Sequence, residues 1–166
     1  MSIYFSILKT KVCGDLYIAA DEKKILSISF KQNWPDVEKK YFDLYQKETL
    51  LIKATKLELK DYFAGKRSKF TFKFEEVGTP FQKKVWRALR SVPFGKTISY
   101  AELAKKIKNP KAVRAVGSAN GKNPLCVATP CHRIIQADGG LGGFSGGLKN
   151  KINLLQFEKS KAATTL

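Results

Sequence analysis

Apolar and polar residues alternate along much of the first 30 residues, as they do in half-buried β-strands. In ILSISF, Leu26, Ile28 and Phe30 fall on one side and two serines on the other. DEKK (residues 21–24) predicts the turn before this strand, and FTFKF (residues 70–74) alternates again and predicts a closing strand. The sequence therefore predicts a small sheet in this part of the chain.

The pattern between these strands, from about residue 35 to residue 64, is helical. Leu50, Ala54 and Leu57 recur at helical spacing and predict a buried face, and Gly65 predicts the end of the helix. EEVGTP, at residues 75–80, follows as a domain boundary. Residues 1–76 are thus predicted to form a small N-terminal α/β domain with a short antiparallel sheet and a mainly structural role.

Residues 77–166 are predicted to form a mostly helical domain. Thr79 and Pro80 can open a helix, whose inner face is expected to carry Phe81, Val85 and Leu89. Capping-box spacing opens a second helix at Ser99 and Glu102, and Asn109-Pro110 ends it. The following KAVRAVGSAN completes a helix-turn-helix, so the fold class is α+β with a winged-helix-like C-terminal domain.

The helix predicted over KAVRAVGSAN, residues 111–120, has an uncommon number of small residues. Val113 and Val116 are expected to face the core. Small residues let the backbone approach a partner closely, and the polar side chains at three- and four-residue spacing on the outer face are Lys111, Arg114 and Ser118.

The net charge of the chain indicates what kind of partner it binds. The net charge is +17, and it is unevenly distributed. Residues 1–78 hold 15 Lys/Arg and 11 Asp/Glu, whereas residues 79–166 hold 16 and 3, which gives +4 and +13. A strongly basic half favours a polyanion, nucleic acid first, although lysines that only maintain solubility would give the same count.

Three cysteines and one histidine in 166 residues suit neither a disulfide framework nor the usual zinc sites, so no metal is expected. No apolar run approaches the roughly 20 residues that span a bilayer, and the N-terminus lacks a signal-peptide pattern. We expect no membrane contact and a cytoplasmic or nucleoid-associated protein, or a nuclear one in a eukaryote.

The candidate chemistry lies in PCHR, residues 130–133. A thiolate is the reactive form of cysteine, and a neighbouring base raises its population, although a lone free cysteine is more often an inert buried thiol. Adjacent side chains on a strand point to opposite faces, so Cys131 and His132 can pair only at a bend or through a bridging water.

Two later segments could complete such a site. The glycine-rich loop, residues 139–147, can bring backbone groups close to a flat ligand or can be a mobile surface loop. The last helix, roughly residues 148–159, is expected to bury Leu148, Ile152 and Leu155. It also carries Glu158, which could orient His132 or could be a plain surface charge.

These motifs together resemble the O6-alkylguanine-DNA alkyltransferases, or methylated-DNA–protein-cysteine methyltransferases. The resemblance covers the whole basic half in the order TPFQKKVWRAL, GKTISYAELA, KAVRAVGSANGKNP, PCHRII, GGFSGGL and LLQFE, whereas the first half fits only loosely. It implies transfer of the alkyl group of O6-alkylguanine, and of O4-alkylthymine, in double-stranded DNA to the protein. The thioether product implies one reaction per molecule, without a cofactor.

The resemblance also assigns roles to residues. Cys131 would accept the alkyl group, His132 would deprotonate it through a bound water, and Glu158 would orient the imidazole. Asn123 would hold together the bend before the active-site strand. Tyr100 would crowd the target phosphate to promote flipping of the nucleotide and would donate to the lesion base.

The remaining assignments concern DNA and the flipped base. Arg114 would fill the gap in the base stack from the minor groove, beside Lys111 and Ser118. Ser145 and the carbonyl groups of Cys131 and Ile134 would hold the guanine. The resemblance implies a monomer and leaves cooperative binding on DNA open.

The chain departs from the family pattern at two positions. Thr129 stands where an apolar branched residue is usual, and Cys126 stands where some members have proline. Both changes bear on the pocket wall and on tolerance for bulky adducts. The cysteine and histidine pairs that bind zinc in some first domains are absent.

Three rival functions fit the residues less well. The main alternative is a non-enzymatic alkylated-DNA-binding or damage-signalling protein, but relatives of that kind have tryptophan at the position of Cys131. A cysteine hydrolase would need a base paired directly with the thiol. A helix-turn-helix regulator would need readout side chains, and KAVRAVGSAN offers few.

The basic half predicts a steep salt dependence. Lysine and arginine side chains that neutralise phosphates release counterions, so affinity for duplex DNA should fall steeply as salt rises from about 50 to 200 mM. Titration of the protein with labelled duplex at several salt concentrations measures this slope. A flat response would contradict the inference from charge.

Overall fold

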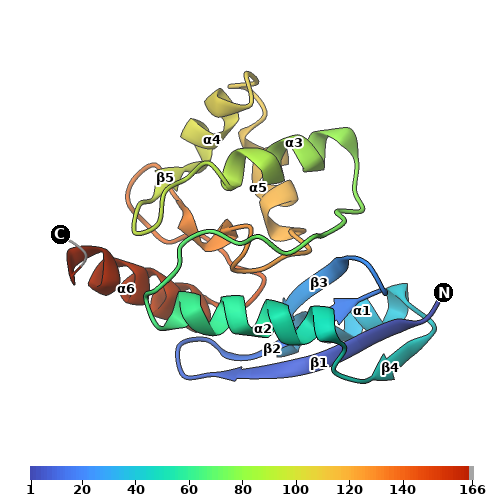
Figure 1. Ribbon diagram of the computed structural model, residues 1–166. Helices are drawn as coiled ribbons and strands as arrows, with labels where there is room; N and C mark the ends of the chain where they lie inside the picture. The colour runs from blue at the N-terminus through green and yellow to red at the C-terminus, as the bar shows by residue number, and fades with distance from the viewer. Residues whose placement is uncertain (165–166) are drawn as a thin grey trace. The chain divides into compact units, whose positions relative to one another are not determined.

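The computed structural model describes residues 1–164, which divide into two compact units. The first comprises Met1–Val77 and the short segment Pro124–Ala128, and the second comprises Gly78–Asn123 and the chain from Thr129 onward. The fold is α+β, as predicted, with a sheet in the first unit and mainly helices in the second (Figure 1). No sequence pattern indicated the return of Pro124–Ala128 to the first unit.

The sheet of the first unit has four strands in the order β3-β2-β1-β4. Strands β1 (Ile3–Thr10), β2 (Gly14–Ala20) and β3 (Ile25–Phe30) form antiparallel pairs. Strand β4 (Leu44–Gln46) pairs in parallel with β1. The sheet is therefore mixed, and β4 interrupts the stretch that the sequence predicted to be helical throughout.

Strand β3 is buried on both faces, whereas its alternation predicted one polar face. Its outer edge is covered: the Ile28 N–H donates to the Pro124 carbonyl, and the Ile28 carbonyl accepts from the Cys126 N–H. The expected closing strand at residues 70–74 is reduced to an isolated bridge between Phe74 and Ile25. The two serines of this strand, Ser27 and Ser29, are therefore buried and do not form a solvent-exposed face.

Two helices pack on this sheet. Helix α1 (Trp34–Lys40) brings Trp34 against Phe5 and Tyr17, with ring centroids 4.8 and 5.0 Å apart. Helix α2 (Leu50–Phe63) packs against β1 and β2, in front of them in Figure 1, and Thr49 caps its first turn.

The buried face of α2 is not the predicted one. Leu50 and Leu57 are 87% and 54% exposed and Ala54 is exposed, whereas the buried side chains are Ile52, Thr55, Leu59 and Tyr62. Both sets have helical spacing, and the larger apolar volume of Ile52, Leu59 and Tyr62 accounts for which set faces the sheet.

The second unit contains helices α3 (Pro80–Leu89), α4 (Tyr100–Lys106), α5 (Val113–Gly121) and α6 (Leu148–Thr164). Both predicted helix starts are confirmed, with complete capping boxes at Thr79 and Ser99. Strands β5 (Ile98–Ser99) and β6 (Ile134–Ile135) pair in parallel. A shared core of α3, α4, α5 and β6 includes Val85, Trp86, Leu89, Leu103, Val116 and Ile134.

Three predictions for this unit are wrong. Helix α5 begins only at Val113, because a turn closed by the Ala112 N–H and the Asn109 carbonyl occupies the preceding residues, so Lys111 lies outside the helix. Val113 is then 37% exposed in the first turn, and only Val116 of the two valines is buried. In α6 the side chain of Leu148 is 49% exposed, and the buried residues are Lys151, Leu154 and Glu158.

The corrected face of α2 predicts unequal effects of two neighbouring leucines. Leu59 is fully buried, so Leu59→Ala should lower the free energy of unfolding by about 2–5 kcal/mol. Leu57→Ala, the matched control on the exposed face, should change it by no more than about 0.5 kcal/mol. Denaturant unfolding of both variants measures the difference, and equal losses would contradict the observed orientation.

Candidate active site

Cys131 begins a single turn of 3-10 helix, η2 (Cys131–Arg133), that interrupts the chain before β6. The thiol forms no disulfide and is only 2% exposed. The bend before it is held by Asn123, whose Nδ2 donates to the carbonyl oxygen of Thr129 at 2.7 Å, and that carbonyl also accepts from the Cys131 N–H at 2.8 Å. The structure therefore has the bend that a Cys–His site requires.

The unusual residue Thr129 is completely buried, but its hydroxyl is hydrogen-bonded. Oγ1 accepts a hydrogen bond of 2.9 Å from the guanidinium of Arg90, the residue that follows α3. The hydroxyl of Thr129 is thus tolerated at a position where the resemblance led us to expect an apolar residue, since its oxygen has a charged donor.

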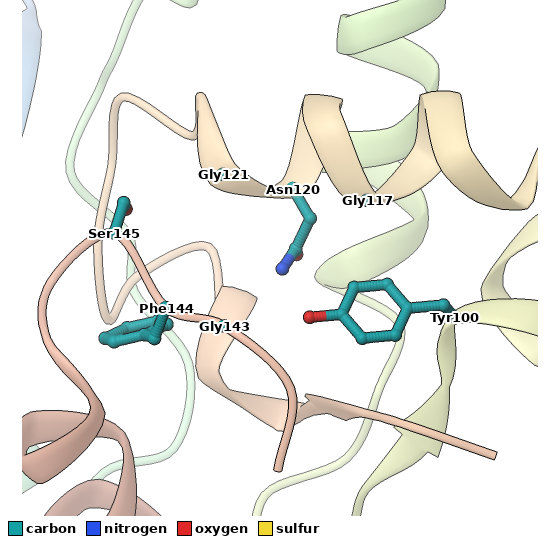
Figure 2. A pocket seen from close by; sticks show the side chains of 7 residues that line it. All are labelled: Tyr100, Gly117, Asn120, Gly121, Gly143, Phe144 and Ser145. Carbon is teal, nitrogen blue, oxygen red and sulfur yellow. The ribbon is translucent and has the colours of Figure 1, made fainter. Parts of the chain in front are cut away.

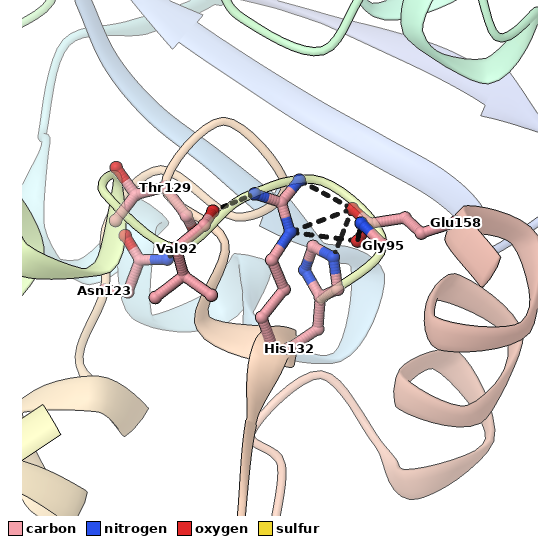
Figure 3. A network of polar contacts seen from close by, with 7 residues as sticks. Val92, Gly95, Asn123, Thr129, His132 and Glu158 are labelled. Atoms are coloured by element: carbon pink, nitrogen blue, oxygen red, sulfur yellow. Dashed lines mark hydrogen bonds and ion pairs between the residues drawn. The ribbon is translucent and has the colours of Figure 1, made fainter. Parts of the chain in front are cut away.

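His132 and Glu158 are brought together as a buried pair. Both side chains are no more than 1% exposed, and His132 Nε2 lies 2.8 Å from Glu158 Oε1 (Figure 3). Glu158 comes from α6, so this contact joins the active-site turn to the last helix. A carboxylate can only accept, so Nε2 carries the proton when the imidazole is neutral.

Arg133 completes the network and is a residue that the sequence reasoning did not select. Its Nε and Nη2 donate to the two carboxylate oxygens of Glu158 at 2.8–3.2 Å, and its Nη1 donates to the Val92 carbonyl at 2.7 Å. The Gly95 N–H adds a bond of 3.2 Å to Oε2. The carboxylate is therefore fully hydrogen-bonded although it is buried.

The electrostatics of this network fix the protonation states near pH 7. Burial raises the pKa of Glu158, but hydrogen bonds and charge from His132 and Arg133 outweigh this effect and bring the pKa to about 2. Burial lowers the pKa of His132, although Glu158 opposes that shift. A neutral imidazole results, with its Nδ1 lone pair buried and without a hydrogen-bond partner among the described residues. His132 can therefore accept a proton at Nδ1.

A cavity of about 360 Å³ lies beside η2, the turn that carries Cys131, and Figure 2 shows its lining. Its residues come from α4, α5 and the glycine-rich loop: Tyr100, Gly117, Asn120, Gly121, Gly143, Phe144 and Ser145. Asn120 connects the cavity to Cys131, because its Nδ2 donates to the Cys131 carbonyl at 3.3 Å. Of the predicted base-pocket residues, the structure places Ser145 in the lining but not Ile134 or Cys131.

Lys151 holds the glycine-rich loop and was also missed by the sequence reasoning. Its side chain is completely buried, and Nζ donates to the carbonyl oxygens of Ile134 at 2.6 Å, Leu141 at 2.5 Å and Gly143 at 3.4 Å. The ammonium also lies 5.9 Å from the ring centroid of Phe144. One lysine thus ties both strand β6 and the cavity wall to α6.

The residues assigned to DNA contact lie on the surface. Arg114 and Ser118 are exposed one turn apart on α5, and Lys111 is exposed in the turn before it. Gly117 lies between them, and a Cβ atom at this position would stand 3.7 Å from the ring of Tyr100. The α5 backbone therefore approaches Tyr100 closely.

In the described part of the chain, no cluster of three or more His, Cys, Asp or Glu side chains is placed to hold a metal ion. No helix within residues 1–164 has the length and apolar character needed to cross a membrane.

Comparison with known families now bears on this site. Residues 80–160 match the DNA-binding domain of 6-O-methylguanine DNA methyltransferase, and residues 3–75 match its ribonuclease-like domain. The chain belongs to the 6-O-methylguanine DNA methyltransferase family. The sequence motifs related the first half of the chain to the family only loosely, but this half matches a family model of its own.

Individual members of this methyltransferase family support the assignment over almost the full length. A Methanosarcina acetivorans protein named methylated-DNA–protein-cysteine methyltransferase is 39% identical over 158 residues, which cover 95% of this chain and 99% of the relative. The crystal structure of Mycobacterium tuberculosis O6-methylguanine methyltransferase has a TM-score of 0.84 at 34% identity, with 96% and 94% coverage. The M. tuberculosis OGT in complex with DNA gives 0.83 at 33% identity, with 95% and 94% coverage.

The buried carboxylate predicts a pH-dependent contribution to stability. The folded pKa of Glu158, about 2, is below its ordinary value of 4.5, so its ionised form stabilises the fold above pH 4.5. This contribution should be lost as pH falls toward 2, and over the full range it amounts to about 3 kcal/mol. The difference in unfolding free energy between wild type and Glu158→Gln, measured from pH 7 to pH 2, should shrink accordingly.

The exposed Glu22→Gln is the matched control for this measurement. A difference between wild type and Glu158→Gln that stays constant across this pH range would contradict the ionised state of the buried carboxylate.

Proposed function

We propose that this protein repairs DNA by transferring the alkyl group of O6-alkylguanine to the sulfur of Cys131. The observation that carries the proposal is the buried pair of His132 and Glu158 next to a cysteine that forms no disulfide, in a chain that matches both domains of the family. A relative that aligns with almost the whole chain is named methylated-DNA–protein-cysteine methyltransferase. A role in damage binding without repair is disfavoured, since it would leave this thiol and its proton acceptor without a use.

The proton path runs from the thiol to the imidazole. Nδ1 of neutral His132 takes the proton of Cys131 through an intervening water, and the resulting imidazolium is stabilised by Glu158. Arg133 keeps the Glu158 carboxylate ionised and in place. The ionised carboxylate can then stabilise the positive charge of the buried imidazolium of His132.

The thiolate sulfur attacks the alkyl carbon, and the new C–S bond forms as the C–O6 bond breaks. Negative charge develops on the leaving guanine, where the Tyr100 hydroxyl in the cavity wall can donate a hydrogen bond. The guanine finally takes up one proton, and the thioether keeps the alkyl group. Since a thioether has no easy leaving group, each molecule reacts once and needs no cofactor.

The DNA surface is formed by α4 and α5, used as a helix-turn-helix. The target base lies inside the duplex, so the nucleotide must flip out before the buried thiol can reach it, at a cost of about a few kcal/mol. Arg114 projects from a helix of small residues, which suits close approach in the minor groove and insertion into the stack. Lys111 and Ser118, which lie before and after Arg114, would contact the sugar-phosphate backbone of the DNA.

We further propose that the protein acts as a monomer on duplex DNA and resides in the cytoplasm or with the nucleoid. Support for the DNA partner comes from the +13 charge of residues 79–166 and from the match of residues 80–160 to a DNA-binding domain.

The transfer can be tested directly by mass spectrometry. Incubation with duplex DNA that contains O6-methylguanine should add about 14 Da, one CH₂ group, to the peptide that carries Cys131. Cys131→Ala should show no gain, whereas Cys126→Ala, a matched control at another buried cysteine, should keep it. If O6-methylguanine stays in the duplex and the Cys131 peptide gains no mass, the proposed function is refuted.

A further inference from the structure

One buried polar atom in the cavity lacks a partner. Asn120 lies near the end of α5, is 5% exposed and lines the cavity, yet its side-chain oxygen Oδ1 accepts no hydrogen bond from any described residue. A buried acceptor without a donor is unfavourable, so a ligand that supplies the donor would bind more tightly. The proposed function gives Asn120 no role, and the sequence reasoning did not single it out.

The orientation of the Asn120 amide follows from its contact with the backbone of Cys131. The Cys131 carbonyl can only accept, so the amide nitrogen must face it, as the 3.3 Å contact from Nδ2 shows. Oδ1 must then point away from that carbonyl. Figure 2 shows the side chain extending from α5 into the space between Tyr100 and Phe144. The helix end is fixed as well, because Trp86 Nε1 donates to the Ala119 carbonyl at 2.8 Å.

The other acceptors assigned to the base each already accept one hydrogen bond from the protein, whereas Asn120 Oδ1 accepts none from the described residues. The Ile134 carbonyl accepts from Lys151 Nζ at 2.6 Å, and the Cys131 carbonyl accepts from Asn120 itself. Tyr100 and Ser145 bring hydroxyl groups to the cavity, and these can donate to ring nitrogens or to O6. Asn120 Oδ1 is thus the buried acceptor of the cavity that has no donor within the described residues.

The lesion base has one matching group. O6-alkylation removes the proton from N1, so the 2-amino group is the only N–H donor left on the base of O6-alkylguanine. O4-alkylthymine has no N–H donor. We propose that Asn120 Oδ1 accepts a hydrogen bond from the 2-amino group of the flipped O6-alkylguanine and makes the site selective for guanine adducts. This inference rests on the proposed function, since it assumes that the base enters this cavity.

Selectivity for the 2-amino group would arise from the cost of leaving Asn120 Oδ1 without a donor. A pocket that contains an unpaired buried acceptor discriminates strongly against a ligand without the donor, because the acceptor then stays unsatisfied in the complex. The same contact would position the base, since Nδ2 of the same amide holds the backbone of the attacking cysteine.

The test combines one change in the protein with one change in the base. Single-turnover rates of transfer are measured on duplexes with O6-methylguanine and with O6-methylhypoxanthine, which differ only in the 2-amino group. Wild type should lose roughly tenfold in rate when the amino group is absent. Asn120→Leu, which has similar volume but no acceptor, should lose no more than about twofold between the two substrates.

The ratio between substrates separates recognition from a structural effect. If Asn120 only supported the fold, Asn120→Leu would slow both reactions equally and keep the wild-type ratio, and this result would overturn the inference. Asn120→Ala serves as a second variant in case leucine distorts the cavity, and it should lose the discrimination in the same way. Failure of wild type to methylate Cys131 at all would instead refute the proposed function.

Discussion

The bonding of Glu158 is the interaction on which the active site depends. A carboxylate with almost no exposure is held by His132, Arg133 and the Gly95 N–H, so that α6, η2 and the turn after α3 converge on one charge. A buried ion pair is stabilising only when its hydrogen bonds are complete, and here each oxygen has more than one donor. The last helix is therefore joined to the turn that carries Cys131 and is part of the proposed active site.

The same network explains how a cysteine followed directly by a histidine can form a reactive site. Strand geometry argued against a direct pair, and the 3-10 turn removes the strand at this point. With Nε2 occupied by Glu158, the imidazole has only Nδ1 left for proton transfer. Asn123 and Arg90 then brace the chain just ahead of the thiol, through the carbonyl and the hydroxyl of Thr129.

The local features of the helices could be predicted from the sequence, and the features that could not be predicted depend on long-range packing. The helix starts at Thr79 and Ser99 are local capping patterns, and the structure confirms them. The face of α2 was misread because two apolar stripes overlap on this helix, and the stripe of larger apolar volume, with Ile52, Leu59 and Tyr62, is the one that faces the sheet. Lys151 was missed, and Arg133 was expected only to add positive charge near the thiol, because only the fold supplies the buried acceptors of these two side chains.

Burial and polarity are combined in the cavity in a way that suits a base and not merely an apolar group. Lys151 fixes the glycine-rich loop by donating to the carbonyl oxygens of Leu141 and Gly143, and Gly143 and Ser145 of this loop line the cavity. The side-chain amide of Asn120 donates from its nitrogen to the backbone carbonyl of Cys131, and its oxygen faces the cavity. A base bound to that oxygen is aligned with the thiol by a single rigid amide, so recognition of the lesion and placement of the nucleophile become one geometric constraint.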